Sequence, residues 1–230
     1  VRAAVIYALR VVAGEDIPLN EGVLDRVDLV RCPGLLDPPF TGDATTDPAV
    51  AIGNTETSQR VVDALLRVFG AGACSQGTMN NLLLGDDTFG YYETICGGAG
   101  AGPGRDGCDA VHTHMTNTRI TDPEVLETRY PLRLDRFAVR RGSGGRGRWR
   151  GGDGVVRELV ALADLRGSIL GQHRVERPYG LDGGGPAKVA LARVIASGEE
   201  RELPGIAAFE LGAGDRLVIE TPGGGGFGAE

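Results

Sequence analysis

Two histidines, His112 and His114, stand two residues apart in "VHTHMTNTRITDPE" and are the first candidates for chemistry in this chain. On a strand their side chains would point to the same face, about 7 Å apart. That spacing suits two ligands of one metal ion, or a base beside an orienting donor. It suits a structural, hydrogen-bonded pair equally well. A metal site needs a third ligand, which Asp109, Glu93 or Asp122 would supply only if the fold brings one of them near.

The residues that follow are polar on both faces of the predicted strand over residues 112–121. One face would carry His112, His114, Thr116, Thr118 and Ile120, and the other Thr113, Met115, Asn117, Arg119 and Thr121. A strand without an apolar face lies at an exposed edge or lines a wet pocket, and the glycine tract before it favours the pocket. Asp122-Pro123 then predicts a turn or a helix start, with Asp122 as the N-cap.

The glycine tract "GGAGAGPG" covers residues 97–104 and includes Gly98 and Gly100. Glycines at this density can turn several N–H groups toward one anion, or they can let backbones pack closely. The GxGxxG spacing of a dinucleotide fingerprint is absent. Close packing is therefore the favoured interpretation, with an anion site as the alternative.

The loop "SQGTMNN" offers hydroxyl and amide side chains, including Asn80 and Asn81, over residues 75–81. Such side chains hold an amide or carboxylate well, but they are also common turn formers. No GxSxG elbow accompanies them, so a serine hydrolase is not indicated.

The stretch "RRGSGGRGRWRGGDG" resembles RNA-binding arginine-glycine segments. The chain nevertheless carries a net charge of -7 and a single lysine, Lys188, which argues against a nucleic-acid binder. A long hairpin connection, or an arginine cluster that grips an anion, is the favoured interpretation.

Several bulk properties limit the class of protein. The four cysteines form no CxxC pair, and no apolar run reaches the roughly 20 residues needed to span a bilayer, so a cytoplasmic protein is expected. The 230 residues suffice for one large domain or two small ones. Because the chain starts at Val1 without methionine, we expect it to be a piece of something longer.

The elements that would position these residues follow from periodicity. We predict a helix over residues 1–12, buried on most sides and ended by Gly14, and a helix over 58–69 ended by Gly70. Strands are predicted over 27–30, 134–140, 155–162 and 217–220, the last followed by a flexible tail. The fold class is α+β, with helices in the N-terminal third and mostly β-sheet with glycine-rich loops in the C-terminal half. We expect a helix-containing part over 1–130 and a β-rich part over 131–230.

Six strings, taken in order, resemble the hydantoinase B / 5-oxoprolinase family from end to end. They are "IGNTETSQRVVD", "SQGTMNN", "FGYYETICGGAGAGPG", "VHTHMTNTRITDPEVLETRYP", "GSGGRGRWRGGDGVVREL" and "TPGGGGFG". The resemblance implies the C-terminal part of a B subunit or B domain. It also implies two partners, an A subunit that binds ATP with Mg on an actin-like fold and the N-terminal half of the B chain.

The reaction that the resemblance implies is ATP-dependent opening of a cyclic amide such as 5-oxoproline or a hydantoin. The carbonyl oxygen is phosphorylated and water then attacks; related carboxylases activate ketones with similar subunits. The resemblance places a divalent metal of unknown identity in the N-terminal half of the B chain.

The resemblance also implies which residues lie near the active-site cavity. As our own hypothesis for their roles, His112, His114, Glu93 and Asp122 would be catalytic, with either histidine as a proton shuttle. Substrate contacts would come from Asn80, Asn81, Asn117, Arg119, Gly98 and Gly100, with Arg119 as a clamp for carboxylate or phosphate. One departure is Gln172-His173-Arg174, where relatives commonly carry an acid before two arginines.

Two alternatives stay open. The chain is a non-catalytic or truncated scaffold that binds the A subunit, or it belongs to a related ATP-dependent ketone carboxylase. RNA binding through residues 140–150 ranks last.

Overall fold

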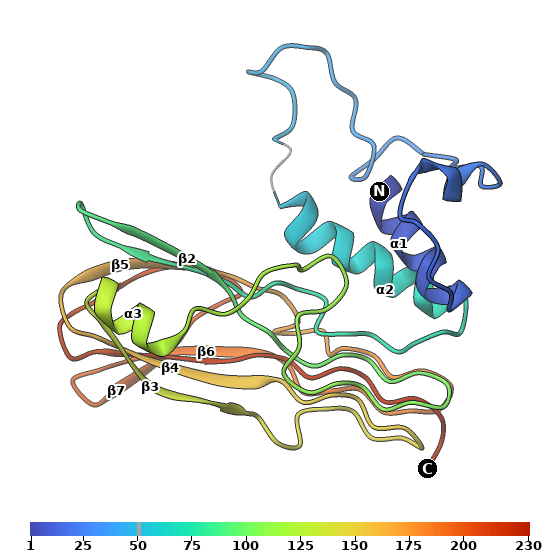
Figure 1. The fold of residues 1–230 in the computed structure, drawn as a ribbon. Helices are drawn as coiled ribbons and strands as arrows, with labels where there is room; N and C mark the ends of the chain where they lie inside the picture. The colour runs from blue at the N-terminus through green and yellow to red at the C-terminus, as the bar shows by residue number, and fades with distance from the viewer. Residues whose placement is uncertain (50–51) are drawn as a thin grey trace.

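The computed structural model describes residues 1–49 and 52–230 and combines a helical N-terminal region with two antiparallel sheets (Figure 1). The α+β class and the placement of most helices before the sheets are confirmed. The helices and strands are α1 (Arg2–Ala13), α2 (Ser58–Val68), β1 (Asn81–Gly85), β2 (Gly90–Thr94), α3 (Pro123–Arg129), β3 (Leu132–Val139), β4 (Val155–Ala161), β5 (Leu165–Leu170), β6 (Leu191–Ala196), β7 (Glu199–Glu202), β8 (Ile206–Leu211) and β9 (Arg216–Glu220).

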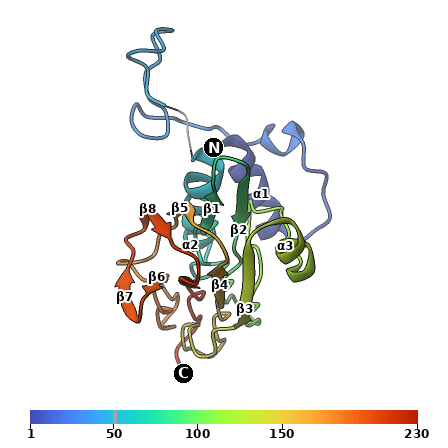
Figure 2. The same cartoon turned by 90° about the vertical axis from the view of Figure 1, so that its left-hand side faces the viewer.

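The predicted first helix is confirmed, because Gly14 ends α1 in the left-handed conformation and donates its amide to the Arg10 carbonyl. The prediction that it is buried on most sides is confirmed for its middle and not for its ends. Ala4, Val5, Ile6 and Ala8 are buried, while Val11 and Val12 remain well exposed. One face of α1 packs on α2, and residues 23–29 cover a second face, where Val5 and Ile6 meet Leu24 (Figure 2).

The second predicted helix is confirmed to within a residue, but its start differs. A turn of π-helix, Gly53–Thr57, precedes α2, and Ser58 Oγ donates to the Asn54 carbonyl in place of a side-chain N-cap. At the other end Gly70 is left-handed and Ala71 donates to the Leu66 carbonyl. The α2 stripe that faces the protein consists of Gln59, Val62, Asp63 and Leu66.

Two predicted strands do not form. Residues 27–30 carry no ladder, and Val30 is 87% exposed. Residues 112–121 form an irregular segment, because side chains and not a neighbouring strand satisfy its polar groups. The Thr113 carbonyl accepts a hydrogen bond from the Gln59 side chain, and the Thr118 hydroxyl is hydrogen-bonded to the Thr94 hydroxyl. The Thr121 amide donates to the Glu93 carboxylate.

The two sheets have the strand orders β2-β1-β5-β8 and β3-β4-β9-β6-β7, with every pairing antiparallel. The β3–β4 pair joined by a long glycine-arginine connection and the final strand β9 confirm the predictions. One hydrophobic cluster takes side chains from both sheets, including Leu82, Ile169, Leu159 and Ile219, so the sheets pack face to face. This cluster runs across position 130, and the predicted division into parts 1–130 and 131–230 stays a prediction.

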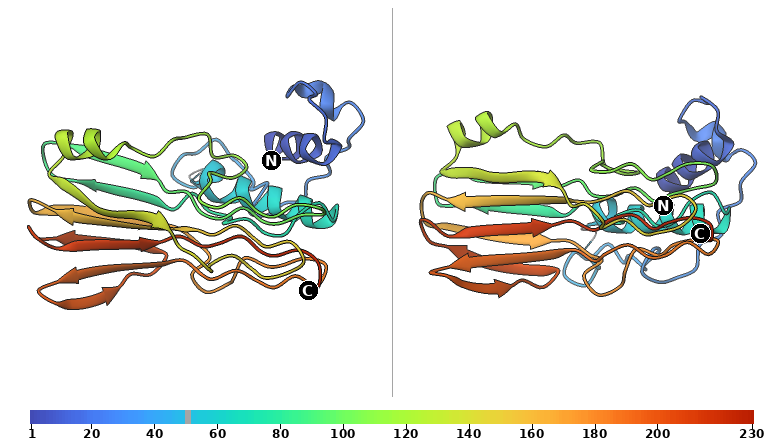
Figure 3. Two further views of the ribbon diagram at one scale, coloured as in Figure 1. Left: turned by 60° about the horizontal axis from the view of Figure 1, so that its bottom comes forward. Right: turned by 90° about the horizontal axis from the view of Figure 1, so that it is seen from below.

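Beyond the sheets, extended glycine-rich segments lie side by side (Figure 3). Gly98 donates to the Pro222 carbonyl, Gly152 to Ala99 and Gly224 to Gly152, at 2.9 to 3.0 Å. A Cβ on Gly98 would overlap the backbone of Gly152. The close-packing interpretation of the glycine tract is therefore confirmed, whereas the flexible tail was wrong: residues 221–228 are buried.

Candidate active site

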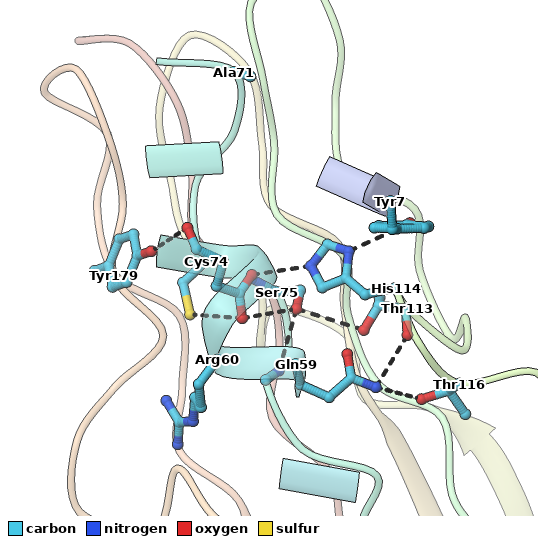
Figure 4. Close-up of polar contacts among 12 residues, drawn as sticks. Tyr7, Gln59, Arg60, Ala71, Cys74, Ser75, Thr113, His114, Thr116 and Tyr179 are labelled. Carbon is cyan, nitrogen blue, oxygen red and sulfur yellow. Dashed lines mark hydrogen bonds and ion pairs between the residues drawn. The ribbon is translucent and has the colours of Figure 1, made fainter. Parts of the chain in front are cut away.

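A buried carboxylate, Asp63, organises the polar groups beneath α2. Figure 4 shows two of its partners, Ser75 and His114. Its Oδ1 accepts the Ser75 amide at 2.9 Å and lies 3.0 Å from His114 Nε2, and its Oδ2 accepts from Ser75 Oγ at 3.2 Å. Burial alone would raise the pKa of Asp63, but the hydrogen bonds from His114 and Ser75 together lower it. Asp63 is therefore a carboxylate that orients His114.

His114 connects this carboxylate to α1. Because Asp63 only accepts, the Nε2 of His114 carries a proton and donates it to Oδ1. Tyr7 places its hydroxyl 3.5 Å from Nδ1, and the two rings meet edge to face with centroids 5.8 Å apart. Burial, followed by the charge of Asp63, raises the pKa of Tyr7. The row Asp63–His114–Tyr7 has the geometry of a general base with its orienting carboxylate.

His114 has a φ of 51°, in the left-handed region, which few residues other than Gly adopt, although Asn, Asp and His are enriched there. Its ring meets Asp63 on α2. Local strain of this kind clusters at functional sites, so His114 is the strongest candidate among the predicted catalytic residues.

A cavity of about 370 Å³ opens beside this row, between α1, the end of α2 and the glycine tract. Apolar side chains such as Val11, Leu66 and Val111 form much of its wall. Its polar groups are few: Tyr7, Arg105, Cys108, His112, Thr113 and His114. A largely apolar pocket with a few convergent polar groups is typical of a small-molecule site.

His112 also lines a second cavity of about 420 Å³ together with Arg119, Phe137 and Ile120. Its Nδ1 is buried and meets no partner among the described residues. Burial lowers the pKa of His112, and the charge of Glu93 partly offsets this. His112 is therefore a mostly neutral imidazole between two cavities.

A second polar group lies on the other side of Asp63. Arg60 on α2 points its Nη1 at His173 Nε2, 2.6 Å away, while His173 Nδ1 lies 2.6 Å from the Glu176 carbonyl. Burial and the Arg60 charge lower the pKa of His173 to about 4. The Cys74 thiol, 3.6 Å from both His173 and Asp63, has its pKa raised by burial and by Asp63, so it is not an activated nucleophile.

The structure brings some predicted site residues together and separates others. His112, His114 and Gly100 line the first cavity, and His112 and Arg119 line the second. Asn117 is exposed, and Gly98 is enclosed by backbone.

The remaining predicted residues have structural partners. Glu93 is fully buried in an ion pair with Arg157, whose Nε lies 2.8 Å from its Oε2. Asp122 is the N-cap of α3, accepting the amides of Glu124 and Val125. Asn80 bonds Gln76 and the Ile95 carbonyl, and Asn81 accepts from Tyr92.

The sequence did not single out Asp63, Tyr7 or Arg105. The signal for Asp63 was present, because Gln59 and Asp63 interrupt the apolar stripe of α2 at a spacing of four residues. A polar residue within the apolar stripe of a helix is expected to be buried and hydrogen-bonded, because an unpaired buried polar group is costly. Tyr7 and Arg105 carry no comparable local signal.

Metal binding was tested on the same residues. Over positions 1–49 and 52–230, no group of three or more His, Cys, Asp or Glu side chains is placed to hold a metal ion. No helix in this part of the chain is long and apolar enough to cross a membrane.

The fold has two solved counterparts. An ATP-dependent caprolactamase from Pseudomonas jessenii superposes with a TM-score of 0.81 at 24% identity, covering 98% of this chain and 42% of that one. A nucleotide-free acetone carboxylase gives a TM-score of 0.58 at 21% identity, covering 68% and 26%. At these identities the likeness concerns the fold.

Sequence relatives are closer. The 5-oxoprolinase of Dictyostelium discoideum is 48% identical over 228 residues, and 5-oxoprolinase 1 of Arabidopsis thaliana is 50% identical over 230. The matches cover 98% and 99% of this chain but 18% of each relative, so the chain spans about a fifth of their length. The Hydantoinase B/oxoprolinase family model matches residues 1–230. The chain therefore belongs to the hydantoinase B/oxoprolinase family.

Proposed function

We propose that this chain is part of an enzyme of the 5-oxoprolinase type, which opens a cyclic amide in a reaction driven by ATP. The observation that carries the proposal is the 50% identity to 5-oxoprolinase 1 of Arabidopsis thaliana across 99% of the chain. An amide is a poor electrophile, and phosphorylation of its carbonyl oxygen creates a leaving group before water attacks.

In this proposal the first cavity holds the small substrate. Arg105 faces the carboxylate of 5-oxoproline, and the Asp63–His114–Tyr7 row accepts a proton from the attacking water. His112 remains the second candidate for proton transfer, and Arg119 the clamp on the side of the second cavity. Glu93, Asn80, Asn81, Asn117, Asp122 and the two glycines support these groups from nearby.

The partners in this proposal are an A-type subunit that binds ATP with Mg and the N-terminal half of the B chain. Two observations support them. The chain spans 18% of the length of its 5-oxoprolinase relatives. Leu19, Val30, Leu35 and Phe40 are all more than half exposed, which is typical of a surface that another polypeptide covers. The described residues present no cluster that fits a metal, and we derive no step through one.

The test is ATP hydrolysis that depends on 5-oxoproline, measured on the complete B chain co-expressed with its A-type subunit. We expect His112→Ala and Arg119→Ala to lower the rate, while Arg201→Ala, on the exposed strand β7, leaves it unchanged. Wild-type rates in both cavity variants would remove those residues from the mechanism. No coupled hydrolysis by the wild type would instead favour a scaffold.

A further inference from the structure

The side chain of Gln59 is buried beneath α2, and no step of the proposed reaction uses it. It is 0% exposed and lies on the same face of α2 as Asp63, one helical turn earlier. It lines neither of the two cavities described above, so its amide does not contact a ligand bound in them. Any role of Gln59 in the reaction therefore acts through its neighbours.

The Gln59 amide holds both ends of the turn that carries His114 (Figure 4). Because the Thr113 carbonyl only accepts, the Nε2 of Gln59 points to it, at 3.2 Å. The second proton of Nε2 goes to Thr116 Oγ1, at 2.6 Å. The Thr116 amide donates to the Thr113 carbonyl at 3.1 Å and closes the turn. His114 thus lies between the two residues that Gln59 contacts.

The backbone of this turn is strained at His114. Among residues 113–116 only His114 has a positive φ, at 51°. A left-handed conformation is costly for a residue with a Cβ, so it persists only where the surrounding structure holds it. The two hydrogen bonds from Gln59 supply such a restraint from the side of α2.

Packing alone does not account for an amide at position 59. The Oε1 of Gln59 is buried and meets no donor in the described part of the chain. A buried polar atom without a partner is costly, and a methionine of similar length would avoid that cost. What the methionine would lack is the pair of donors on Nε2, and these are the atoms that hold the turn.

We propose that Gln59 is a positioning residue for His114, an inference that rests on the function proposed above. Its amide fixes the turn over residues 113–116, and the fixed turn keeps the His114 Nε2 at 3.0 Å from Asp63 Oδ1. Helix α2 therefore acts on His114 twice. Asp63 orients the ring, and Gln59, four residues earlier, holds the backbone on both sides of it.

The decisive variant is Gln59→Met, which removes both donors and keeps the length of the side chain. In the complete enzyme we expect kcat for ATP hydrolysis coupled to 5-oxoproline to fall about tenfold, the effect of one or two hydrogen bonds. KM should stay nearly unchanged, because Gln59 lines neither cavity. Thr116→Val removes one acceptor and should lower kcat by about threefold. Thr128→Val makes the same change on an exposed residue of α3 and should leave kcat unchanged.

A double variant separates positioning from a general loss of structure. In a His114→Asn background, Gln59→Met should lower kcat no further, because both changes act on the same imidazole. If Gln59 only stabilises the fold, the two losses of kcat should instead multiply.

A second readout does not depend on turnover. Diethyl pyrocarbonate modifies accessible imidazoles, and mass spectrometry of the complete enzyme without ATP follows the reaction at His114. The His114 side chain is 12% exposed, so modification of the wild type should be slow. We expect it to be about threefold faster or more in Gln59→Met, because the ring is no longer held against Asp63. Thr128→Val should match the wild type.

An unchanged modification rate at His114 in a folded Gln59→Met enzyme would overturn the inference. A further loss of kcat in the double variant, as large as the loss that Gln59→Met causes alone, would overturn it as well. Faster modification in Gln59→Met, together with a wild type that does not couple ATP hydrolysis to 5-oxoproline, would support the positioning and refute the proposed function. If Gln59→Met unfolds, Thr116→Val decides by the same two readouts.

Discussion

His114 contacts Asp63 and has a left-handed backbone conformation. A variant that tests its imidazole must therefore keep this backbone conformation. Asn tolerates the left-handed conformation, whereas Ala is strained there by about 1 kcal/mol or more. We expect His114→Asn to lower the ATP hydrolysis coupled to 5-oxoproline by roughly a hundredfold, the range of general base catalysis, and to cost about 1–3 kcal/mol of stability because the buried Asp63 loses a donor. Steady-state kinetics and thermal denaturation check the two parts. A stable variant with full activity would exclude His114 as the base.

Glu56 and His173 have opposite effects on stability as the pH changes. The pKa of His173 is lowered to about 4, so its contribution is complete above pH 6.5 and is lost as the pH falls toward 4. The pKa of Glu56 is raised to about 7, so the folded state is favoured at low pH and loses stability between pH 4.5 and 7. Each effect amounts to roughly 3 kcal/mol.

Because the two effects oppose each other, single variants should separate them. In Glu56→Gln the free energy of unfolding should fall as the pH drops from 6.5 to 4. In His173→Asn, which keeps the left-handed backbone at φ 54°, it should fall as the pH rises from 4.5 to 7. Urea denaturation at a series of pH values measures both. Parallel profiles for the two variants would contradict the assignment.

At the scale of elements, α3 is a short helix whose start depends on Asp122. The carboxylate accepts the Glu124 amide at 2.9 Å, and Pro123 occupies the first turn. We expect Asp122→Ala to cost about 1 kcal/mol of stability, as other N-cap losses do, and Asp122→Asn to cost much less. Chemical denaturation measures the difference.

The same pair of variants tests whether Asp122 has a catalytic role. If it acts only as a cap, both variants keep the kcat of the wild type. A large loss of kcat in Asp122→Asn, which preserves the cap, would restore Asp122 to the mechanism.

In the sheets too, a residue that was predicted to be catalytic has a structural partner. Glu93 on β2 and Arg157 on β4 join the two sheets through a buried ion pair, and Arg157 also stacks over Phe137. Removing one partner of such a pair leaves an uncompensated buried charge. A loss of activity in a Glu93 variant must therefore be separated from a loss of folding.

At the scale of the whole molecule, the closely packed glycine segments form one wall of the first cavity. A Cβ on Gly98 would overlap backbone on two neighbouring segments, while a Cβ on Gly90 meets nothing within 4 Å. We expect Gly98→Ala to destabilise the protein by about 3 kcal/mol or more, since backbone cannot yield as a side chain can. Gly90→Ala, at the start of β2, should change stability by less than about 1 kcal/mol. Equal melting temperatures for the two variants would refute the packing role.

Much of the architecture could be predicted from local pattern. The stripe of α2, the β3 and β4 runs and the final strand β9 have apolar periodicity that depends only on neighbours in the sequence. Residues 112–121 could not be predicted in this way. Their polar groups are satisfied by side chains from α2 and β2, so alternation suggested a strand where none forms.

The sequence by itself determined the family, the α+β class and the close packing of the glycine tract, because each can be inferred from residues that are neighbours in the sequence. The tertiary structure alone decided which polar groups meet. Asp63, His114 and Tyr7 come from three segments up to 107 positions apart. Packing brings together side chains that are far apart in the chain, and no local sequence pattern predicts which of them will be in contact.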